Sequence, residues 1–197
     1  MSLFEKSMNL EEKQKKLKLV LKPKRFIHSV NVMNVSVELA GKYGVDKDEA
    51  ALAGLLHDCA RDCSKEELLG YCTQYCIIPD DVLLLQPELL HGRVGAFLAR
   101  DVYCVDSPQV LEAISSHTMG SPGMDMLACI VFLADYIEPA RSFPGVEAIR
   151  EEAFKDLKKA MLIGIEGTIS SILAKGSLLH PDTVATRNWL IKKRPIS

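Results

Sequence analysis

A histidine and an aspartate stand side by side where the surrounding pattern predicts the protein interior. The stretch LLHDCARD runs from Leu55 to Asp62, and its two leucines lead directly into His57 and Asp58. Burying an ionised carboxylate is costly unless the carboxylate is paired with a positive charge or bound to a metal ion. The stretch therefore indicates either a strained piece of core or an interior site that uses both side chains.

Other side chains of the same two types occupy similar positions. The chain has five histidines. His28 lies in a pattern that is apolar on several sides, His91 opens LLHGRVGAF, His117 ends VLEAISSHT, and Asp135 follows nine apolar residues. A single histidine at a helix end is more often a cap or a satisfied core residue, so the argument depends on the combination. If these helix ends converge, six candidate metal ligands gather at one point: His28, His57, Asp58, His91, His117 and Asp135.

The six cysteines suggest a second, weaker metal hypothesis. Cys59 and Cys63 are four residues apart, as are Cys72 and Cys76, and no Cys-x-x-Cys pair occurs. A zinc site with this spacing is the less favoured alternative. We expect buried free thiols in a reducing cytoplasm instead.

Composition restricts the class of protein. The chain has 197 residues, is 48% hydrophobic and carries a net charge of −2, which suits one globular domain without a general basic surface. We therefore expect no nucleic-acid partner. No signal peptide is recognisable, and the longest apolar run is far shorter than the roughly 20 residues that span a bilayer. These features predict a cytoplasmic protein with no membrane partner.

The sequence pattern predicts a succession of helices as the elements that position the six side chains. Capping-box signals occur at Asp46/Glu49 and Ser64/Glu67, and Pro108 after Ser107 is a typical helix start. No strand-and-turn alternation, internal repeat or low-complexity linker interrupts this pattern. The sequence predicts an all-α bundle of about eight helices with short loops. Exposed apolar positions in a long segment, 146–174, could support a homodimer.

The order His…His-Asp…Asp resembles that of the HD-domain metal-dependent phosphohydrolases, an all-α superfamily. Five blocks, RFIHSV, LLHDCARD, LLHGRVGAF, SSHTMG and ADYIEPAR, are similar in order and spacing to the YqeK-type symmetrical bis(5'-nucleosyl)-tetraphosphatases, over roughly residues 22–189. Arg61 stands where lysine is common, and HTMG stands where HTTG is common, but neither departure removes a ligand. The resemblance implies an HD-domain helical bundle over residues 22–197, with residues 1–21 as an amphipathic helix packed on it or extending it.

The resemblance also implies a dinuclear metal site. It assigns one ion to His28, His57, Asp58 and Asp135, with Asp58 as a bridge to a second ion on His91 and His117. It points to iron, although the same donors suit Mn, Co, Ni or Zn. Two such ions can share a water molecule and lower its pKa, which produces a hydroxide able to attack phosphorus.

Four arginines lie within a few residues of these ligands and are candidate phosphate contacts, because a guanidinium can hold phosphate oxygens in a bidentate fork. Arg61 ranks first, since the related enzymes have a phosphate-contacting base there. Asp62 could orient Arg61 or act as a general acid, and a helix-end salt bridge is the alternative. The other three arginines are Arg25, Arg93 and Arg141.

Further polar and aromatic side chains near the candidate ligands could serve the site or could have a purely structural role. Ser29 and Thr118 could reach ligands or phosphate, or bond to the local backbone. Tyr136 could stack on a purine, with core packing as the alternative. Glu138 is expected to end its helix, with a role behind the ligands possible. His180 lies outside every block and is expected to be a cap or a surface residue.

Taken together, the residues and the resemblance predict a metal-dependent hydrolase that cuts diadenosine tetraphosphate symmetrically into two ADP. One alternative is another HD-superfamily phosphohydrolase or phosphodiesterase that acts on a nucleoside mono- or triphosphate or a cyclic dinucleotide. Another is a non-catalytic nucleotide-binding module, which the complete ligand set disfavours. A plain helical core with capping histidines leaves two charged residues at apolar helix ends unexplained.

Overall fold

The computed structural model of the chain describes residues 8–192, and within this range it contains helices and no strand. The predicted all-α class is confirmed. The helices are α1 (Leu10–Val20), α2 (Pro23–Tyr43), α3 (Lys47–Leu56), α4 (Lys65–Gln74), α5 (Asp81–Leu85), the 3₁₀ helix η1 (Pro87–Leu90), α6 (His91–Tyr103), α7 (Pro108–Ser116), α8 (Met126–Ile137), α9 (Val146–Ala153), α10 (Leu157–Ala174) and α11 (Pro181–Lys192).

The described residues form eleven α-helices, so the predicted number of about eight is too low. Part of the difference is the long segment 146–174, which is divided into α9 and α10. Helix α9 ends at Ala153, and Asp156 then caps α10 by accepting a hydrogen bond from the backbone N–H of Lys159. The apolar pattern hides this break because Ala153 and Leu157 are buried on either side of it.

Local signals in the sequence start and stop the other helices. The Ser64 hydroxyl and the Glu67 carboxylate form a reciprocal capping box at α4, as predicted. The Asp46 carboxylate caps α3, and the Ser107 hydroxyl caps α7 just before Pro108. Gly44 ends α2 with a φ of 70°, a left-handed conformation that costs glycine little.

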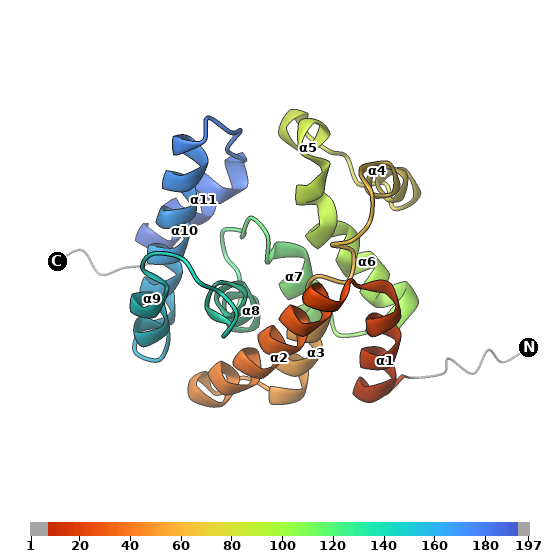
Figure 1. Cartoon of the computed structure of the whole chain (residues 1–197), viewed down its shortest axis with the longest axis horizontal. Helices are drawn as coiled ribbons and strands as arrows, with labels where there is room; N and C mark the ends of the chain where they lie inside the picture. Colours follow the sequence, from red (N-terminus) through yellow and green to blue (C-terminus); the bar gives the residue numbers. More distant parts are fainter. Residues whose placement is uncertain (1–7, 193–197) are drawn as a thin grey trace, which may run out of the picture.

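Helices α2, α3, α7 and α8 form a central group (Figure 1). Helix α2 packs against α3 and α8, and α7 packs against α3, α6 and α8. Helices α9 to α11 gather on one side of this group, whereas α4 to α6 lie on the other. Helix α8 is buried along most of its length, with Ile130, Phe132 and Leu133 almost inaccessible to solvent. The carboxyl end of α8 is therefore held firmly in the interior.

Helix α1 covers one edge of this group. Leu17 is fully buried, and the Lys16 ammonium donates a hydrogen bond of 2.8 Å to the carbonyl of Val102 on α6. The division into an N-terminal element, residues 1–21, and a domain, residues 22–197, stays a prediction, and residues 1–7 of it lie outside the described range. Within residues 8–192, no helix is both long enough and apolar enough to cross a membrane.

Helices α2 and α3 approach each other closely at one glycine. A Cβ atom on Gly54 would lie 2.8 Å from the Cα of Met33 and 2.8 Å from the Ser36 hydroxyl. The absence of a side chain at Gly54 lets the two backbones come together. This contact sets the distance between the helices that carry His28 and His57.

Candidate metal centre

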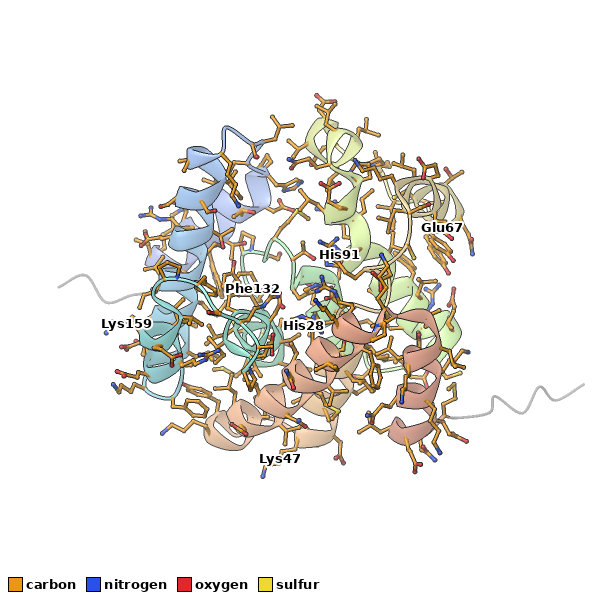
Figure 2. All side chains as sticks on the ribbon, viewed as in Figure 1. His28, Lys47, Glu67, His91, Phe132 and Lys159 are labelled. Carbon is orange, nitrogen blue, oxygen red and sulfur yellow. The ribbon has the colours of Figure 1, made fainter. Side chains whose placement is uncertain are left out.

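The six predicted ligands come from five helices whose ends or first turns meet inside the bundle. His28 lies in the second turn of α2, and Asp135 lies near the end of α8. His57 and His117 directly follow α3 and α7, and His91 is the first residue of α6. Figure 2 shows His28 and His91 near the centre of the molecule. Six side chains spread along residues 28–135 are thereby brought within a few ångströms of one another.

The first cluster consists of His28, His57, Asp58 and Asp135. The Nε2 atom of His28 lies 3.2 Å from the Nε2 of His57 and 2.9 Å from a carboxylate oxygen of Asp135. The Oδ2 atom of Asp58 lies 3.6 Å from the first of these nitrogens and 3.4 Å from the second. The donor atoms of the two histidines and Asp58 all lie within 4.8 Å of one another, which is compact enough to hold one metal ion.

The second cluster consists of Asp58, His91 and His117. The Nε2 atoms of the two histidines lie 3.1 Å apart. The other Asp58 oxygen, Oδ1, lies 3.1 Å from His91 and 3.6 Å from His117. Asp58 therefore presents one oxygen to each cluster, the arrangement that a carboxylate bridging two ions requires.

The hydrogen bonds of the imidazole rings test whether this arrangement fits a metal. The Nδ1 atoms of His57, His91 and His117 face backbone carbonyls at 2.8, 2.6 and 2.7 Å, and the Nδ1 of His28 faces a carboxylate oxygen of Glu138 at 3.1 Å. Each of these partners only accepts hydrogen bonds, so a neutral ring that donates to its Nδ1 partner carries its single proton on Nδ1. All four Nε2 atoms are then left with a lone pair.

Lone pairs that face one another at 3.1 and 3.2 Å repel unless a cation lies between them. A proton can join two such atoms, but each cluster offers at least three donor atoms to the same point. A divalent ion satisfies all of them together. The residues therefore fit the metal that the sequence predicts, with nitrogen and oxygen donors typical of Fe, Mn, Co, Ni or Zn.

Burial and charge keep the two ligand carboxylates ionised. Burial by itself would raise the pKa of Asp58, but His57, His117 and His91 lower it well below its ordinary value. Burial opposes ionisation of Asp135 as well, but the neighbouring His28, His57 and Arg141 outweigh that effect, so that its pKa is lowered. The centre thus holds two ionised carboxylates among the imidazoles, with only 2% of Asp58 exposed, and buried carboxylates of this kind are suitable ligands for a metal ion.

A cleft of about 620 Å³ opens over both clusters. One wall carries cationic side chains and ligand residues, and the far end is apolar. This volume lies within the ordinary range for small-molecule sites of about 300–1,000 Å³. The residues that line it include Arg25, Asp58, Arg61, His91, His117, Thr118, Asp135, Tyr136, Arg141, Phe143, Pro144, Ile149, Ile163 and Thr168.

Three of the four candidate arginines line this cleft. Arg25 donates to Asp58 at 2.7 Å, and Arg141 donates to the carboxylate and backbone carbonyl of Asp135. The backbone N–H of Arg61 donates to the carbonyl of Asp58 at 2.9 Å, but its side chain has no hydrogen bond or ion pair with any residue in the range 8–192. Its guanidinium is therefore available to an anionic ligand.

Three other predicted site residues are not brought into the cleft. Arg93 points to the opposite side of α6 from the ligands and pairs with Asp182 at 2.7 Å. Asp62 accepts a hydrogen bond of 2.7 Å from the backbone N–H of Lys22, and its other oxygen lies 3.8 Å from the Lys22 ammonium, which forms a helix-end salt bridge. Ser29 is fully buried inside the bundle and does not line the cleft.

Thr118 and Tyr136 do line the cleft. The Thr118 hydroxyl lies 3.2 Å from the Nε2 of His91 and 3.3 Å from that of His117. The Tyr136 hydroxyl pairs with Thr168 on α10 at 2.9 Å, and burial raises the pKa of this phenol to about 12. Tyr136 thus presents its ring, not an ionised oxygen, to the cleft.

Sequence reasoning missed the contribution of the C-terminal helices to this cleft. Ile163 and Thr168 of α10, together with Phe143 in the preceding loop, form its far wall. They belong to an amphipathic pattern in which nothing marks a ligand-facing position. His180 was expected to be a cap or a surface residue. It does cap α11, but it is only 3% exposed because Asp80 covers it at 2.8 Å.

The cysteines take no part in either cluster. All six are free thiols, of which Cys59, Cys72 and Cys129 are buried, as predicted, whereas Cys76 and Cys104 are exposed. The Cys59 thiol donates to the carbonyl of Gly95 at 3.3 Å and so engages the backbone of α6. Among residues 8–192, the groups compact enough for a metal contain only histidine and aspartate.

Comparisons with known proteins agree with this geometry. The HD domain family matches residues 25–140, a segment that contains all six candidate ligands. A symmetrical bis(5'-nucleosyl)-tetraphosphatase of Bacillus subtilis is 40% identical over 93% of this chain and 98% of its own length. One of Staphylococcus aureus is 32% identical over 92% and 94%. The crystal structure of a protein from Clostridium acetobutylicum, described as a predicted HD superfamily hydrolase involved in NAD metabolism, superposes with a TM-score of 0.93 at 40% identity and covers 95% of this chain and 99% of that one.

Proposed function

This chain belongs to the HD-domain family, together with the symmetrical bis(5'-nucleosyl)-tetraphosphatases, and we propose that it is a metal-dependent hydrolase that cuts diadenosine tetraphosphate into two ADP. The observation that carries the proposal is the pair of clusters joined by Asp58, with one carboxylate oxygen directed to each. Two-metal sites of this kind serve in-line displacement at phosphorus.

We propose that His28, His57, Asp58 and Asp135 hold one divalent ion and that Asp58, His91 and His117 hold the other. When bound there, the ions supply Lewis acidity and lower the pKa of water. The family resemblance favours iron, and the donor atoms suit this choice because nitrogen and oxygen are present without thiolate.

The cleft has complementary features for a dinucleoside polyphosphate. The phosphate chain is strongly anionic, and Arg61 is free to bind its oxygens in a bidentate fork. Arg25 and Arg141 line the same cleft and form ion pairs with Asp58 and Asp135, and from these positions they can also bind phosphate oxygens. The apolar end, with Phe143 and Ile163, suits a purine ring.

In the reaction, water attacks one of the two inner phosphorus atoms, and the bond to the oxygen between the inner phosphates breaks. The leaving group is one ADP, and the attacked half becomes the other. Arg61, Arg25 and Arg141 offset the charge that develops on the phosphoryl oxygens and on the leaving phosphate. Thr118 lies beside His91 and His117 and orients the polar atoms at that end of the site.

The partner in this proposal is a nucleotide, and we place the reaction in the cytoplasm. A homodimer is proposed through apolar side chains that α9 and α10 leave exposed, among them Phe154 and Leu173. Neither nucleic acid nor a membrane is expected as a partner, because the net charge is −2 and the surface has no general basic character.

A chromatographic product assay tests the proposal. Protein prepared anaerobically with ferrous iron should convert diadenosine tetraphosphate to ADP alone, and Asp58→Ala should lose both metals and all turnover while keeping its helical circular dichroism. Formation of AMP and ATP would show attack on an outer phosphorus. Cleavage only of mononucleotides, cyclic dinucleotides or NAD would show that the proposed substrate is wrong and would support only the broader assignment as an HD-domain hydrolase. Full activity of Asp58→Ala would refute the bridging role.

A further inference from the structure

Glu138 is a buried carboxylate that touches the proposed metal centre without belonging to it. It is only 2% exposed and stands at the C-cap of α8, three residues after Asp135. Its Oε1 lies 3.1 Å from the Nδ1 of His28. Its Oε2 accepts hydrogen bonds of 2.8 Å from the side-chain amide of Asn31 and from the backbone N–H of Ala140. Both oxygens of a buried charge are thus committed to neighbouring donors.

His28 differs from the other three histidines in where it lies on its helix. His57 and His117 follow helix ends, where the last carbonyls have no backbone donor and accept from the imidazole of the residue three positions on. His91 uses the carbonyl of Glu88 in the same way at the end of η1. His28 lies inside the 21-residue helix α2, whose carbonyls are engaged in helix hydrogen bonds. It therefore needs an acceptor from elsewhere, and Glu138 supplies it.

The partners of Glu138 fix the orientation of the His28 ring. The groups around the carboxylate are donors: the ring Nδ1–H, the Asn31 amide, the Ala140 N–H and, at 4.0 Å, the Arg141 guanidinium. Asn31 is three residues after His28 on α2, so both project from the same face of the helix. Asn31 and Ala140 fix the position of the carboxylate by donating to Oε2, so that Oε1 faces the Nδ1 of His28. This arrangement favours the tautomer of His28 that leaves Nε2 free for a metal.

Glu138 also makes the two clusters unequal in charge. The Nδ1 atom of His28 contacts a carboxylate, whereas the Nδ1 atoms of His91 and His117 contact neutral backbone carbonyls. A carboxylate that accepts from a ligating histidine raises the basicity of that ligand. The first cluster has, in addition, Asp135 as a carboxylate that the second cluster lacks.

We propose that Glu138 is a positioning residue that locks His28 in its metal-binding tautomer and makes the His28/His57/Asp58/Asp135 cluster the tighter of two unequal cation sites. The inference rests on the proposed metal-dependent function, since it assumes that both clusters bind divalent ions. It assigns Glu138 no contact with the substrate or with either ion.

Glu138→Gln is the informative substitution because glutamine has a single acceptor oxygen. If that oxygen stays with Asn31 and Ala140, the amide NH₂ faces the Nδ1 of His28. A donor at that point favours the opposite tautomer, in which Nε2 carries the proton and cannot bind a metal. The matched control is Glu151→Gln, an exposed glutamate on the neighbouring helix α9.

Calorimetric titration of the metal-free protein with Mn²⁺ tests the inequality. The wild-type protein and Glu151→Gln should bind two ions with different affinities. Glu138→Gln should weaken the tighter site about 10- to 100-fold and leave the weaker one unchanged. Two equal sites, or a variant that weakens neither or both alike, would overturn the inference. Failure of the wild-type protein to bind any ion would instead refute the proposed function.

A second measurement needs no stable variant. In the metal-free wild-type protein, at a pH where the imidazoles are neutral, ¹⁵N correlation spectra should show the proton of His28 on Nδ1. In Glu138→Gln, it should move toward Nε2, while the spectra of the other three rings stay unchanged. A wild-type His28 protonated on Nε2 would overturn the inference even if Glu138→Gln does not fold.

Discussion

Substituting Gly54 by alanine should destabilise the protein, although alanine is the better helix former. The new Cβ would lie 2.8 Å from the Cα of Met33, so α2 and α3 must separate by about 0.7 Å to restore an ordinary carbon–carbon contact of about 3.5 Å. The Cα and N atoms of Met33 belong to the backbone of a 21-residue helix and cannot rotate away.

The expected magnitude follows from two opposing effects. Overpacking in a tight core costs about 1–3 kcal/mol, and contacts with rigid backbone place Gly54 near the upper limit. Replacing a helical glycine by alanine stabilises a helix by about 1 kcal/mol, because alanine has the higher helix propensity. The net loss in the free energy of unfolding should therefore be about 2 kcal/mol. Because α3 carries His57 and Asp58 at its end, the displacement should also lower metal affinity.

Gly70→Ala is the matched control. Gly70 lies inside α4, and a Cβ there would meet nothing within 4 Å. The same change should raise the free energy of unfolding by about 0.5–1 kcal/mol. Urea denaturation of the two metal-free variants and of the wild-type protein measures both effects. Equal stabilisation by the two substitutions would refute the close helix contact and the argument that it sets the spacing of the histidines.

Three other features of the structure lead to measurable outcomes. His180→Ala should lower the melting temperature, because it removes a buried cap of α11, while turnover stays near wild type; a large loss of turnover at unchanged stability would contradict this. A disulfide reagent at neutral pH should label Cys76 and Cys104 quickly and spare Cys129, where burial raises the thiol pKa to about 12; mass spectrometry of the labelled peptides identifies them. Burial opposes ionisation of Glu138, but hydrogen bonds from its neighbours lower its pKa, so the stability that the carboxylate contributes is present at neutral pH and is lost as the pH falls through the lowered pKa. In the metal-free protein, Glu138→Gln should therefore weaken the decrease in the free energy of unfolding at acid pH. An unchanged pH dependence would argue against this role.

Some parts of this protein follow from the chain alone because their causes are local. The capping signals at Asp46, Ser64 and Ser107 act through backbone groups a few residues away, so sequence could place these helix starts. The pairing of His57 and Asp58 with apolar residues likewise marked a buried polar site, because burial without compensation is costly. Five of the six candidate ligands form the two compact groups in the structure, and Asp135 joins them through its contact of 2.9 Å with His28.

Other parts were decided only by the tertiary structure, because they depend on which groups face each other across distant helices. The motifs place four arginines beside ligands, but side-chain direction on α6 sends Arg93 to Asp182 and away from the cleft. The far wall of the cleft comes from α10, whose apolar pattern is the same whether a side chain meets the core or a ligand. The anion behind His28 is a residue 110 positions away, and only the packing of α8 on α2 brings its carboxylate to the ring.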